Sequence, residues 1–235
     1  MLKFCITDAQ LGQSTVNSQH FWIDIFHDTV CPWCRIGKKH LFDALAQWKG
    51  ETVNIRWHHF ILYHAVPPEG YEYISFMQKR KGLSIAELQQ MFAHVRQVGE
   101  LAGVKLNFDK ISLAVNTQLS HQLIAIAPVK IRNNIVEEIY QAYFEDGLNI
   151  GDIEVLVAIG KNHQMDENTL RLQLTDVNAI DAAVTASIFP RLNGINSVPS
   201  FIFNNKVKVD GSQSVNVLLR ALNRAAFIEV LAKQW

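Results

Sequence analysis

The sequence predicts one α/β domain that is interrupted by a large all-helical insertion. Residues 20–64 have the strand, helix, strand order of a βαβ unit. Residues 65–190 show almost wholly helical patterns, and residues 191–235 return to short apolar strands and a closing helix. We therefore expect a discontinuous domain formed by 20–64 and 191–235, with 65–190 inserted and 1–19 as an N-terminal extension.

The first unit begins with a buried strand in "HFWIDIFHD", residues 20–28, because this run is aromatic, β-branched and too short for a helix. It leads directly into Cys31 and Cys34. A helix follows, and Gly50 stands where a left-handed residue would end it. Residues 53–61 then show the alternation of a second strand.

The middle of the chain is predicted to be helical. Ser84 and Glu87 form a capping box at the start of one helix. Further helices are indicated by four stretches, which are "NTQLSHQLIAIA", "VKIRNNIVEEIYQAYFED" before Gly147, "DIEVLVAIG" and the residues from Asp166 onward. No strand is expected between residues 65 and 190.

The end of the chain predicts a β-hairpin and a helix. In "SFIFNNKVKVDG" two short apolar runs flank Asn204 and Asn205, residues that favour a tight turn. An amphipathic helix follows, with one apolar stripe formed by Leu218, Leu222, Ala225 and Ile228.

Composition and charge exclude several classes of protein. The 235 residues are 49% hydrophobic and 19% charged, which is typical of a globular chain. Lys plus Arg and Asp plus Glu both number 22, so no basic excess is available for nucleic acid or an anionic membrane. No run reaches the roughly 18 apolar residues of a membrane span, and the N-terminus lacks the apolar core of a secretion signal. The cytoplasm is therefore expected.

The cysteine pair stands where a helix begins. Pro32 suits the first helical position, so Cys31 would lie at the positive end of the helix dipole, which favours a thiolate. Cys34 lies one turn on, and this spacing brings the two α-carbons to roughly 5–6 Å, within the range of a disulfide. Arg35 either adds positive charge beside the thiolate or serves the fold alone, and both interpretations stay open.

The spacing of the two cysteines is also compatible with a zinc site or with buried structural thiols. A zinc site needs four ligands, and only one CxxC is present, so His27, His58, His59 or His64 would have to complete it. Nothing places two of them at ligand spacing, and no metal is expected. Buried structural thiols would not need a proline and a helix start. The local context favours redox chemistry.

A second proline stands at the start of an apolar strand. Pro199 follows Val198 in "GINSVPSFIF", where a trans proline would be awkward away from a sheet edge. A cis bond is one solution and costs about 0.5–1 kcal/mol relative to trans. On propensity alone, trans remains the default.

Together these motifs resemble the DsbA-like family of thioredoxin-fold proteins, most closely its FrnE-like branch. The likeness rests on "DTVCPWCRIGKKHL", "AVNTQLSHQL", "QAYFEDGLNI" and "VPSFIF", and it covers nearly all of residues 20–235. It implies a thioredoxin fold with a helical insertion and a cis bond before Pro199. It also implies that Cys31 is the exposed nucleophile and Cys34 the resolving thiol.

The resemblance assigns further residues to the site. Pro32 and Trp33 would support the redox pair, and the backbone of Val198 would dock the substrate chain. Two departures from the family pattern, Arg35 in place of an aromatic residue and Ser197 in place of a glycine, concern substrate preference.

A possible substrate cleft is indicated between the insertion and the redox turn. The resemblance places Asn116, Thr117 and His121 there, and Trp57 is a further candidate. As the alternative, Asn116 caps a helix and His121 packs inside it. Trp57 and Phe60 point to opposite faces of a strand, so at least one of them belongs to the core.

The expected function is thiol–disulfide exchange with protein or small-molecule disulfides, without a required cofactor and with glutathione as a candidate redox partner. One alternative is a glutathione-dependent isomerase or transferase related to 2-hydroxychromene-2-carboxylate isomerase, although such sites place a serine where Cys31 stands. A second alternative is a binding module that holds unfolded chains. Cys5 lies outside the resemblance and is expected to be an incidental thiol.

Overall fold

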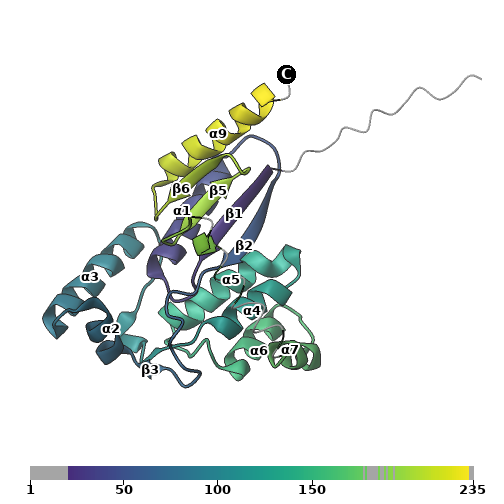
Figure 1. Ribbon diagram of the computed structural model, residues 1–235. Coiled ribbons are helices and arrows are strands. Elements are labelled where there is room, and N and C mark those ends of the chain that lie inside the picture. Colours follow the sequence, from purple (N-terminus) through teal and green to yellow (C-terminus); the bar gives the residue numbers. More distant parts are fainter. Residues whose placement is uncertain are drawn as a thin grey trace, which may run out of the picture.

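A four-stranded sheet forms the centre of the molecule, with strand order β2, β1, β5, β6 (Figure 1). The computed structural model describes residues 21–176, 178, 185, 188, 190–192 and 194–232. The strands are β1 Phe21–His27, β2 Val53–His59, β5 Ser200–Phe203 and β6 Val207–Asp210. β1 is parallel to β2 and antiparallel to β5, which pairs antiparallel with β6. Segments from both ends of the chain thus share one sheet.

The first βαβ unit is confirmed. β1 is buried along nearly its whole length and pairs with β2 from Phe21 opposite Val53 to His27 opposite His59. Parallel neighbours require a crossover connection, and helix α1 (Pro32–Gln47) supplies it. The carboxyl end of β1 and the start of α1 therefore meet in one turn, which holds both cysteines.

The end of α1 differs from the prediction, so the role expected of Gly50 is wrong. The helix ends at Gln47, and Trp48 caps it in an extended conformation with φ −70° and ψ 128°. The backbone N–H of Trp48 donates to the carbonyl of Leu45 at 3.1 Å. The chain has therefore left the helix before it reaches Gly50, which has no positive φ.

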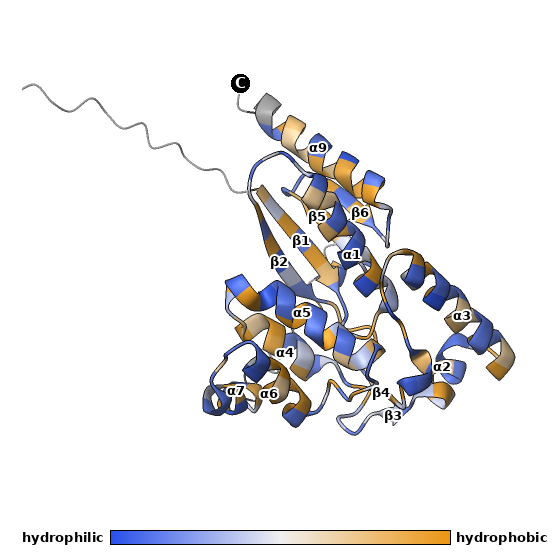
Figure 2. Cartoon of the chain, turned by 180° about the vertical axis from the view of Figure 1, so that it is seen from behind, coloured by the Kyte–Doolittle hydropathy of each residue, from blue (hydrophilic) through white to orange (hydrophobic). Residues whose placement is uncertain are grey.

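The C-terminal hairpin and helix match the prediction. Asn204 and Asn205 have φ of 50° and 56°, as a tight turn between β5 and β6 requires. Helix α9 (Val215–Ala232) follows and packs against α1 and both hairpin strands. Leu218 and Leu222 of its apolar stripe are fully buried, and Figure 2 shows hydrophobic and hydrophilic residues alternating along this helix.

The chain between β2 and β5 is mainly helical, as expected. Its helices are α2 Tyr73–Lys81, α3 Ile85–Leu101, η1 Phe108–Lys110, α4 Gln118–Ile126, α5 Val129–Phe144, α6 Ile153–Asn162 and α7 Glu167–Leu174. The capping box of Ser84 and Glu87 is present. Within the described residues, no helix is long and apolar enough to cross a membrane.

The expectation of no strand in this region is wrong. β3 (Tyr71–Glu72) and β4 (Leu113–Ala114) pair antiparallel, with Tyr71 opposite Ala114. Strands of two residues are too short to show an alternating pattern, so the sequence carries no signal for them. The predicted domain bounds remain predictions, and the predicted extension 1–19 with Cys5 lies outside the described residues.

Arg35 serves the fold and does not line the cavity beside the cysteine pair. Its side chain is 3% exposed and pairs with Glu137 at 3.0 Å and Glu145 at 2.5 Å, and it donates to the carbonyl of Lys105 at 2.7 Å. Lys38 also pairs with Glu137, at 2.7 Å. These contacts tie α1 to α5 and compensate the positive charge that the sequence places near the cysteines.

Candidate active site

Cys31 occupies the N-cap position of α1, and its side chain makes no capping hydrogen bond. Its backbone is extended, with φ −93° and ψ 110°, and Pro32 takes the first helical position. The carbonyl of Cys31 accepts the N–H groups of Cys34 at 3.0 Å and Arg35 at 3.3 Å, which begins the helical ladder. Cys31 therefore lies at the positive end of the helix dipole.

The start of β5 lies beside this turn. The Val198–Pro199 peptide bond is cis, as predicted. The Sγ atom of Cys31 lies 3.9 Å from the carbonyl oxygen of Val198 and is placed to donate to it. Gly37 allows this close approach, because a Cβ atom there would lie 2.9 Å from Cγ of Pro199.

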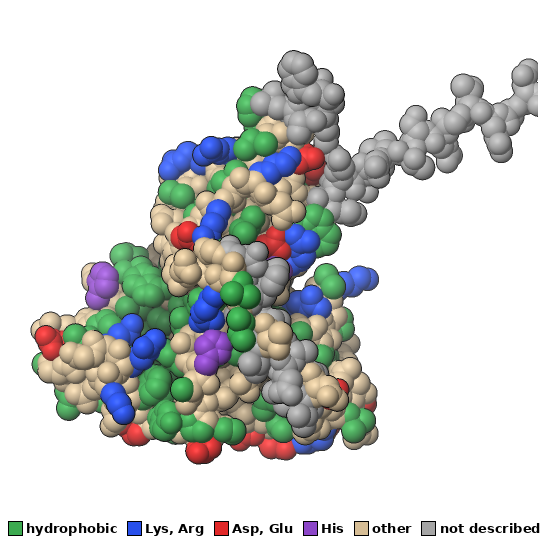
Figure 3. Space-filling view, in the orientation of Figure 1, with side chains coloured by type: hydrophobic (Ala, Val, Ile, Leu, Met, Phe, Trp, Pro, Cys, Tyr) green, Lys and Arg blue, Asp and Glu red, His purple; other side chains and the backbone are tan. Residues whose placement is uncertain are grey.

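A cavity of about 550 Å³ opens at Cys31, and Cys34 is not among the residues that line it. It is lined by Val30, Cys31, Pro32, Trp33, Leu62, Tyr63, Tyr73, Met77, Arg80, Lys81, Met91, Phe92, His94, Val95, Phe108, Ala114, Val115, Tyr143 and Val198. Most of these side chains are apolar, and none is acidic. Figure 3 shows hydrophobic side chains in the hollow between the sheet and the α2–α3 region, with Lys and Arg side chains nearby.

The two thiols differ in their surroundings. Both cysteines are free and buried in this structure, with exposed fractions of 5% for Cys31 and 2% for Cys34, so the exposure that the resemblance implies for Cys31 is not observed. Burial, followed by the hydrogen bond and charge of Cys31 and the charge of Asp28, raises the pKa of Cys34 well above its ordinary value. Cys34 is thus held as a thiol while Cys31 faces the cavity.

A group of buried polar side chains lies beneath the pair. One carboxylate oxygen of Asp28 accepts the N–H of Leu62 at 2.7 Å, and the other lies 3.4 Å from Nε2 of His121. His27 hydrogen-bonds the hydroxyl of Tyr140 at 2.8 Å. Burial, followed by the charges of neighbouring histidines, lowers the pKa of His27 well below its ordinary value. Sequence reasoning missed Asp28, although it stands three residues before Cys31.

The histidines considered as zinc ligands do not form such a site. His27 and His121 are close, with ring centroids 5.2 Å apart, and His59 lies 4.9 Å from His121. His58 instead pairs with Asp24 at 2.6 Å. In the described part of the chain, no group of three or more His, Cys, Asp or Glu residues could hold a metal ion.

The four residues expected at a substrate cleft do not line the cavity at Cys31. Asn116 donates to the carbonyl of Val66 at 2.7 Å and accepts the N–H of Gln118 at 2.9 Å, so it fixes the start of α4. Thr117 is buried beside it.

His121 and Trp57 occupy the interior below the pair. His121 is fully buried beside Asp28. Trp57 donates through Nε1 to Asn133 at 2.8 Å, and its ring centroid lies 4.6 Å from that of His27. Both residues therefore support the cysteine-bearing turn from within the fold, and neither lines the cavity at Cys31.

Side chains from α2 and the loop after β2 form a wall that sequence reasoning missed. Burial, followed by the charges of Asp28 and Cys31, raises the pKa of Tyr63 to about 12, so its hydroxyl stays neutral at physiological pH. Met77 and Arg80 of α2 lie on the same wall. The sequence signal for this wall is weak, because neither segment adjoins the cysteines along the chain.

The fold and this site define a class of protein. A family model described as a DSBA-like thioredoxin domain matches residues 22–223. The chain therefore belongs to the DsbA-like thioredoxin-domain family, and its fold is the thioredoxin fold with a helical insertion.

Individual relatives agree with this family. Protein YwbO of Bacillus subtilis (strain 168) is 23% identical over 205 residues, which cover 86% of this chain and 95% of that protein. A probable DsbA oxidoreductase from Streptomyces coelicolor has a TM-score of 0.79 at 22% identity, covering 88% of this chain and 90% of its own. The cytosolic disulfide reductase DsbM from Pseudomonas aeruginosa, solved with glutathione, has a TM-score of 0.58 at 17% identity, covering 90% and 99%.

The fold is also similar to that of an isomerase. A structure of 2-hydroxychromene-2-carboxylate isomerase has a TM-score of 0.68 at 13% identity, covering 89% of this chain and 98% of its own. These structural likenesses concern the fold, and the chemistry has to be argued from the site.

Proposed function

We propose that the protein is a thiol–disulfide oxidoreductase that works through Cys31 and Cys34. The observation that carries this proposal is the asymmetry of the pair. Cys31 caps a helix and lines a cavity, whereas Cys34 lies behind it with a raised pKa. A nucleophile must reach its substrate, and a resolving thiol needs to reach only the nucleophile.

The reaction proceeds through two exchanges. The thiolate of Cys31 attacks one sulfur of a substrate disulfide, forms a mixed disulfide and releases the other sulfur as a thiolate. Cys34 then loses its proton and attacks Sγ of Cys31, which releases the second substrate sulfur and leaves a Cys31–Cys34 disulfide. Two electrons pass from the protein to the substrate. The reverse sequence oxidises a dithiol.

The partners belong to the same proposal. The substrates are protein or small-molecule disulfides, and the residues need no resident cofactor for the exchange. Glutathione is proposed as the redox partner, supported by the DsbM structure that contains it. The cytoplasm and the FrnE-like branch are proposed with the function. Equilibrium against glutathione redox buffers would show which direction is favoured.

An insulin-reduction assay with dithiothreitol tests the function. The rate should fall to the uncatalysed level in Cys31→Ser, because the attacking sulfur is removed. Cys5→Ser is the matched control and should keep the wild-type rate. Equal rates in Cys31→Ser and the wild type would reject the proposal.

The fold likeness to 2-hydroxychromene-2-carboxylate isomerase supports a second candidate, a glutathione-dependent isomerase or transferase. Such chemistry needs one activated thiol and no resolving cysteine. Tight glutathione binding with isomerase turnover that survives Cys34→Ser would favour it over the oxidoreductase.

A further inference from the structure

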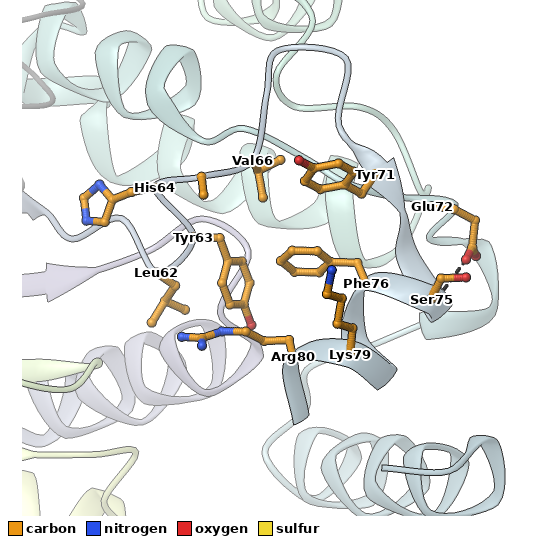
Figure 4. Close-up of a pocket in the computed structure, with 11 residues that line it drawn as sticks. Leu62, Tyr63, His64, Val66, Tyr71, Glu72, Ser75, Phe76, Lys79 and Arg80 are labelled. Carbon is orange, nitrogen blue, oxygen red and sulfur yellow. Dashed lines mark hydrogen bonds between the residues drawn. The ribbon is translucent and has the colours of Figure 1, made fainter. Parts of the chain in front are cut away.

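A second and larger cavity adjoins the cavity at Cys31. It has a volume of about 750 Å³, within the usual range for small-molecule sites. Leu62, Tyr63 and Arg80 line both cavities, so the two share a wall. The loop after β2, strand β3 and helix α2 enclose the second cavity (Figure 4). The exchange at Cys31 does not need this second cavity. A substrate that extends beyond its disulfide group could reach it from Cys31.

Aromatic rings form one side of this second cavity. The ring centroid of Phe76 lies 5.0 Å from that of Tyr63, edge to face, and 5.8 Å from that of Tyr71, nearly parallel. Figure 4 shows the ring of Phe76 between those of Tyr63 and Tyr71. Tyr71 is 47% exposed, so its ring is accessible from solvent. The wall therefore offers ring faces and edges to an apolar or aromatic group.

The other side of the cavity is basic. Lys79 and Arg80 line it at the end of α2, and Lys81 follows in the cavity at Cys31. None of the three has an ion-pair partner within the described residues. The guanidinium of Arg80 lies over the ring of Tyr63, 5.8 Å from its centroid. A chain with equal numbers of acidic and basic residues thus presents uncompensated positive charge here.

Among the described residues, Glu72 is the one acidic side chain that lines the second cavity, and its carboxylate is already engaged. The carboxylate of Glu72 accepts the N–H groups of Ile74 at 3.0 Å and Ser75 at 2.7 Å, and so caps α2. Figure 4 draws the bond between Glu72 and Ser75 at the edge of the view, away from Arg80. Glu72 therefore leaves the charge of Lys79 and Arg80 available to an anion from solution.

We propose that this cavity binds the part of a substrate that lies away from its disulfide, and that the substrate is a small disulfide carrying carboxylates. A carboxylate lies between Lys79 and Arg80, and an apolar or aromatic group packs on Tyr63, Phe76 and Tyr71. This inference rests on the proposed oxidoreductase function. To that function the inference adds a class of substrate and the residues that select this substrate.

Three disulfides of similar length and different charge test the charge selection. They are 3,3′-dithiodipropionate, which is anionic, bis(2-hydroxyethyl) disulfide, which is neutral, and cystamine, which is cationic. The readout is kcat/KM for each, corrected for the rate of the same disulfide with a simple thiol. The wild type should prefer the anionic over the neutral disulfide, and the neutral over the cationic. Added salt should narrow these preferences, because it screens exposed charges.

A double variant identifies the residues responsible. Lys79→Gln with Arg80→Gln should lower the ratio of kcat/KM for the anionic to the neutral disulfide by about tenfold. Lys130→Gln with Arg220→Gln removes the same net charge from exposed positions on α5 and α9, and it should leave the ratio unchanged. An unchanged ratio in the first variant, or an equal fall in the second, would overturn the inference.

The aromatic wall has its own test. The probes are 5,5′-dithiobis(2-nitrobenzoate), which is anionic and aromatic, and 3,3′-dithiodipropionate, which is anionic and aliphatic. Tyr71→Ala should reduce the preference for the aromatic probe several-fold, because the probe can no longer stack its ring on that of Tyr71. Phe227→Ala, an exposed ring on α9, is the matched control and should retain the preference. The same preference in both variants would remove the aromatic wall from the site.

Failure of this inference can be told apart from failure of the proposed function. Reduction of the neutral disulfide must be lost in Cys31→Ser if the protein is an oxidoreductase of the proposed kind. If that loss occurs and the Lys79, Arg80 variant keeps the wild-type ratio, only the substrate class is wrong. If Cys31→Ser retains activity, the function itself is wrong.

Discussion

Asp28 is the buried residue whose charge bears most directly on the second step of the exchange. Its carboxylate accepts the N–H of Leu62 and lies beside His121, and both Asp28 and His121 are fully buried. Its negative charge is one of the causes, after burial and Cys31, that raise the pKa of Cys34. Cys34 must lose a proton before it can attack, so Asp28 affects when it becomes nucleophilic.

Asp28→Asn should therefore lower the pKa of Cys34. The asparagine keeps an oxygen for the N–H of Leu62, removes the charge and places an NH2 group in place of the oxygen beside His121. The measurement is a titration of thiolate absorbance in a background with Cys5→Ser and Cys31→Ser, in which Cys34 is the single thiol. Asp43→Asn, at a partly exposed position of α1, serves as the control. A pKa of Cys34 that is unchanged or higher in Asp28→Asn would contradict this account.

At the scale of single residues, the sequence predicts the reacting cysteines better than it predicts the side chains that surround them. The proline after Cys31 is a local feature, and the helix start that it predicts is confirmed. The cis bond before Pro199 is also confirmed, but it was implied by the family resemblance, since propensity alone favours trans. The partners of Asp28 come from the loop after β2 and from α4, so no spacing in the sequence reveals them. Arg35 could not be assigned from the sequence, since Glu137 and Glu145 lie about a hundred residues away along the chain.

Among the elements, the contact of α1 with β5 controls the geometry of the site. Gly37 faces Pro199 and Phe201, and a Cβ atom would lie 2.9 Å from Cγ of Pro199 and 3.2 Å from Cζ of Phe201. Phe201 is fully buried in the core, and Pro199 is buried as well. The helix therefore lies as close to the proline as a glycine permits.

Gly37→Ala should reduce the free energy of unfolding despite the better helix propensity of alanine. Overpacking costs about 1–3 kcal/mol, and the gain in propensity is about 1 kcal/mol. We expect a net loss of up to about 2 kcal/mol in urea unfolding, together with slower exchange at Cys31. Gln47→Ala, at an exposed position of the same helix, is the control. A free energy of unfolding in Gly37→Ala that equals or exceeds that of the wild type would contradict this expectation. It would show that β5 can move away from α1 without loss of stability.

Elements with a clear period or a cap are predicted well. The strand of residues 21–27, the capping box of Ser84 and the turn at Asn204 follow from local chemistry and are confirmed. The short strands β3 and β4 depend on two distant segments meeting, and the end of α1 depends on the backbone of Trp48. These features are set by tertiary contacts that a pattern along the chain does not contain.

On the scale of the whole molecule, the buried His27 makes stability depend on pH. Burial, followed by the charges of His121 and His59, lowers its pKa well below the ordinary value of 6.5. The unfolded chain takes up a proton at this residue as the pH falls through about 6.5, and the folded chain does not. The stability that neutral His27 contributes is thus complete above that pH and is lost below it.

The free energy of unfolding should fall with a steeper slope between pH 6.5 and 5 in the wild type than in His27→Gln. The difference is at most about 1.4 kcal/mol per pH unit for one proton. Urea unfolding at a series of pH values measures it, and His40→Gln, at a partly exposed position, serves as the control. Identical slopes in the wild type and His27→Gln would show that His27 is protonated in the folded state.

The site as a whole is assembled from segments that lie far apart along the chain. The turn after β1 supplies Cys31, the start of β5 supplies Val198, and α2 supplies Arg80. The sequence therefore predicts the reacting atoms and the family, whereas the shape and charge of the cavities require the packed structure.

The central claim is that Cys31 attacks and Cys34 resolves, and trapping the mixed disulfide tests it most directly. The Cys5→Ser, Cys34→Ser variant is mixed with bis(2-hydroxyethyl) disulfide, and intact mass and peptide mass spectrometry locate the adduct. The Cys5→Ser, Cys31→Ser variant is treated in parallel. We expect a stable mixed disulfide on Cys31, which lines the cavity, in the first protein. We expect little adduct in the second protein on Cys34, which does not line it. Faster modification of Cys34 than of Cys31 would contradict the account.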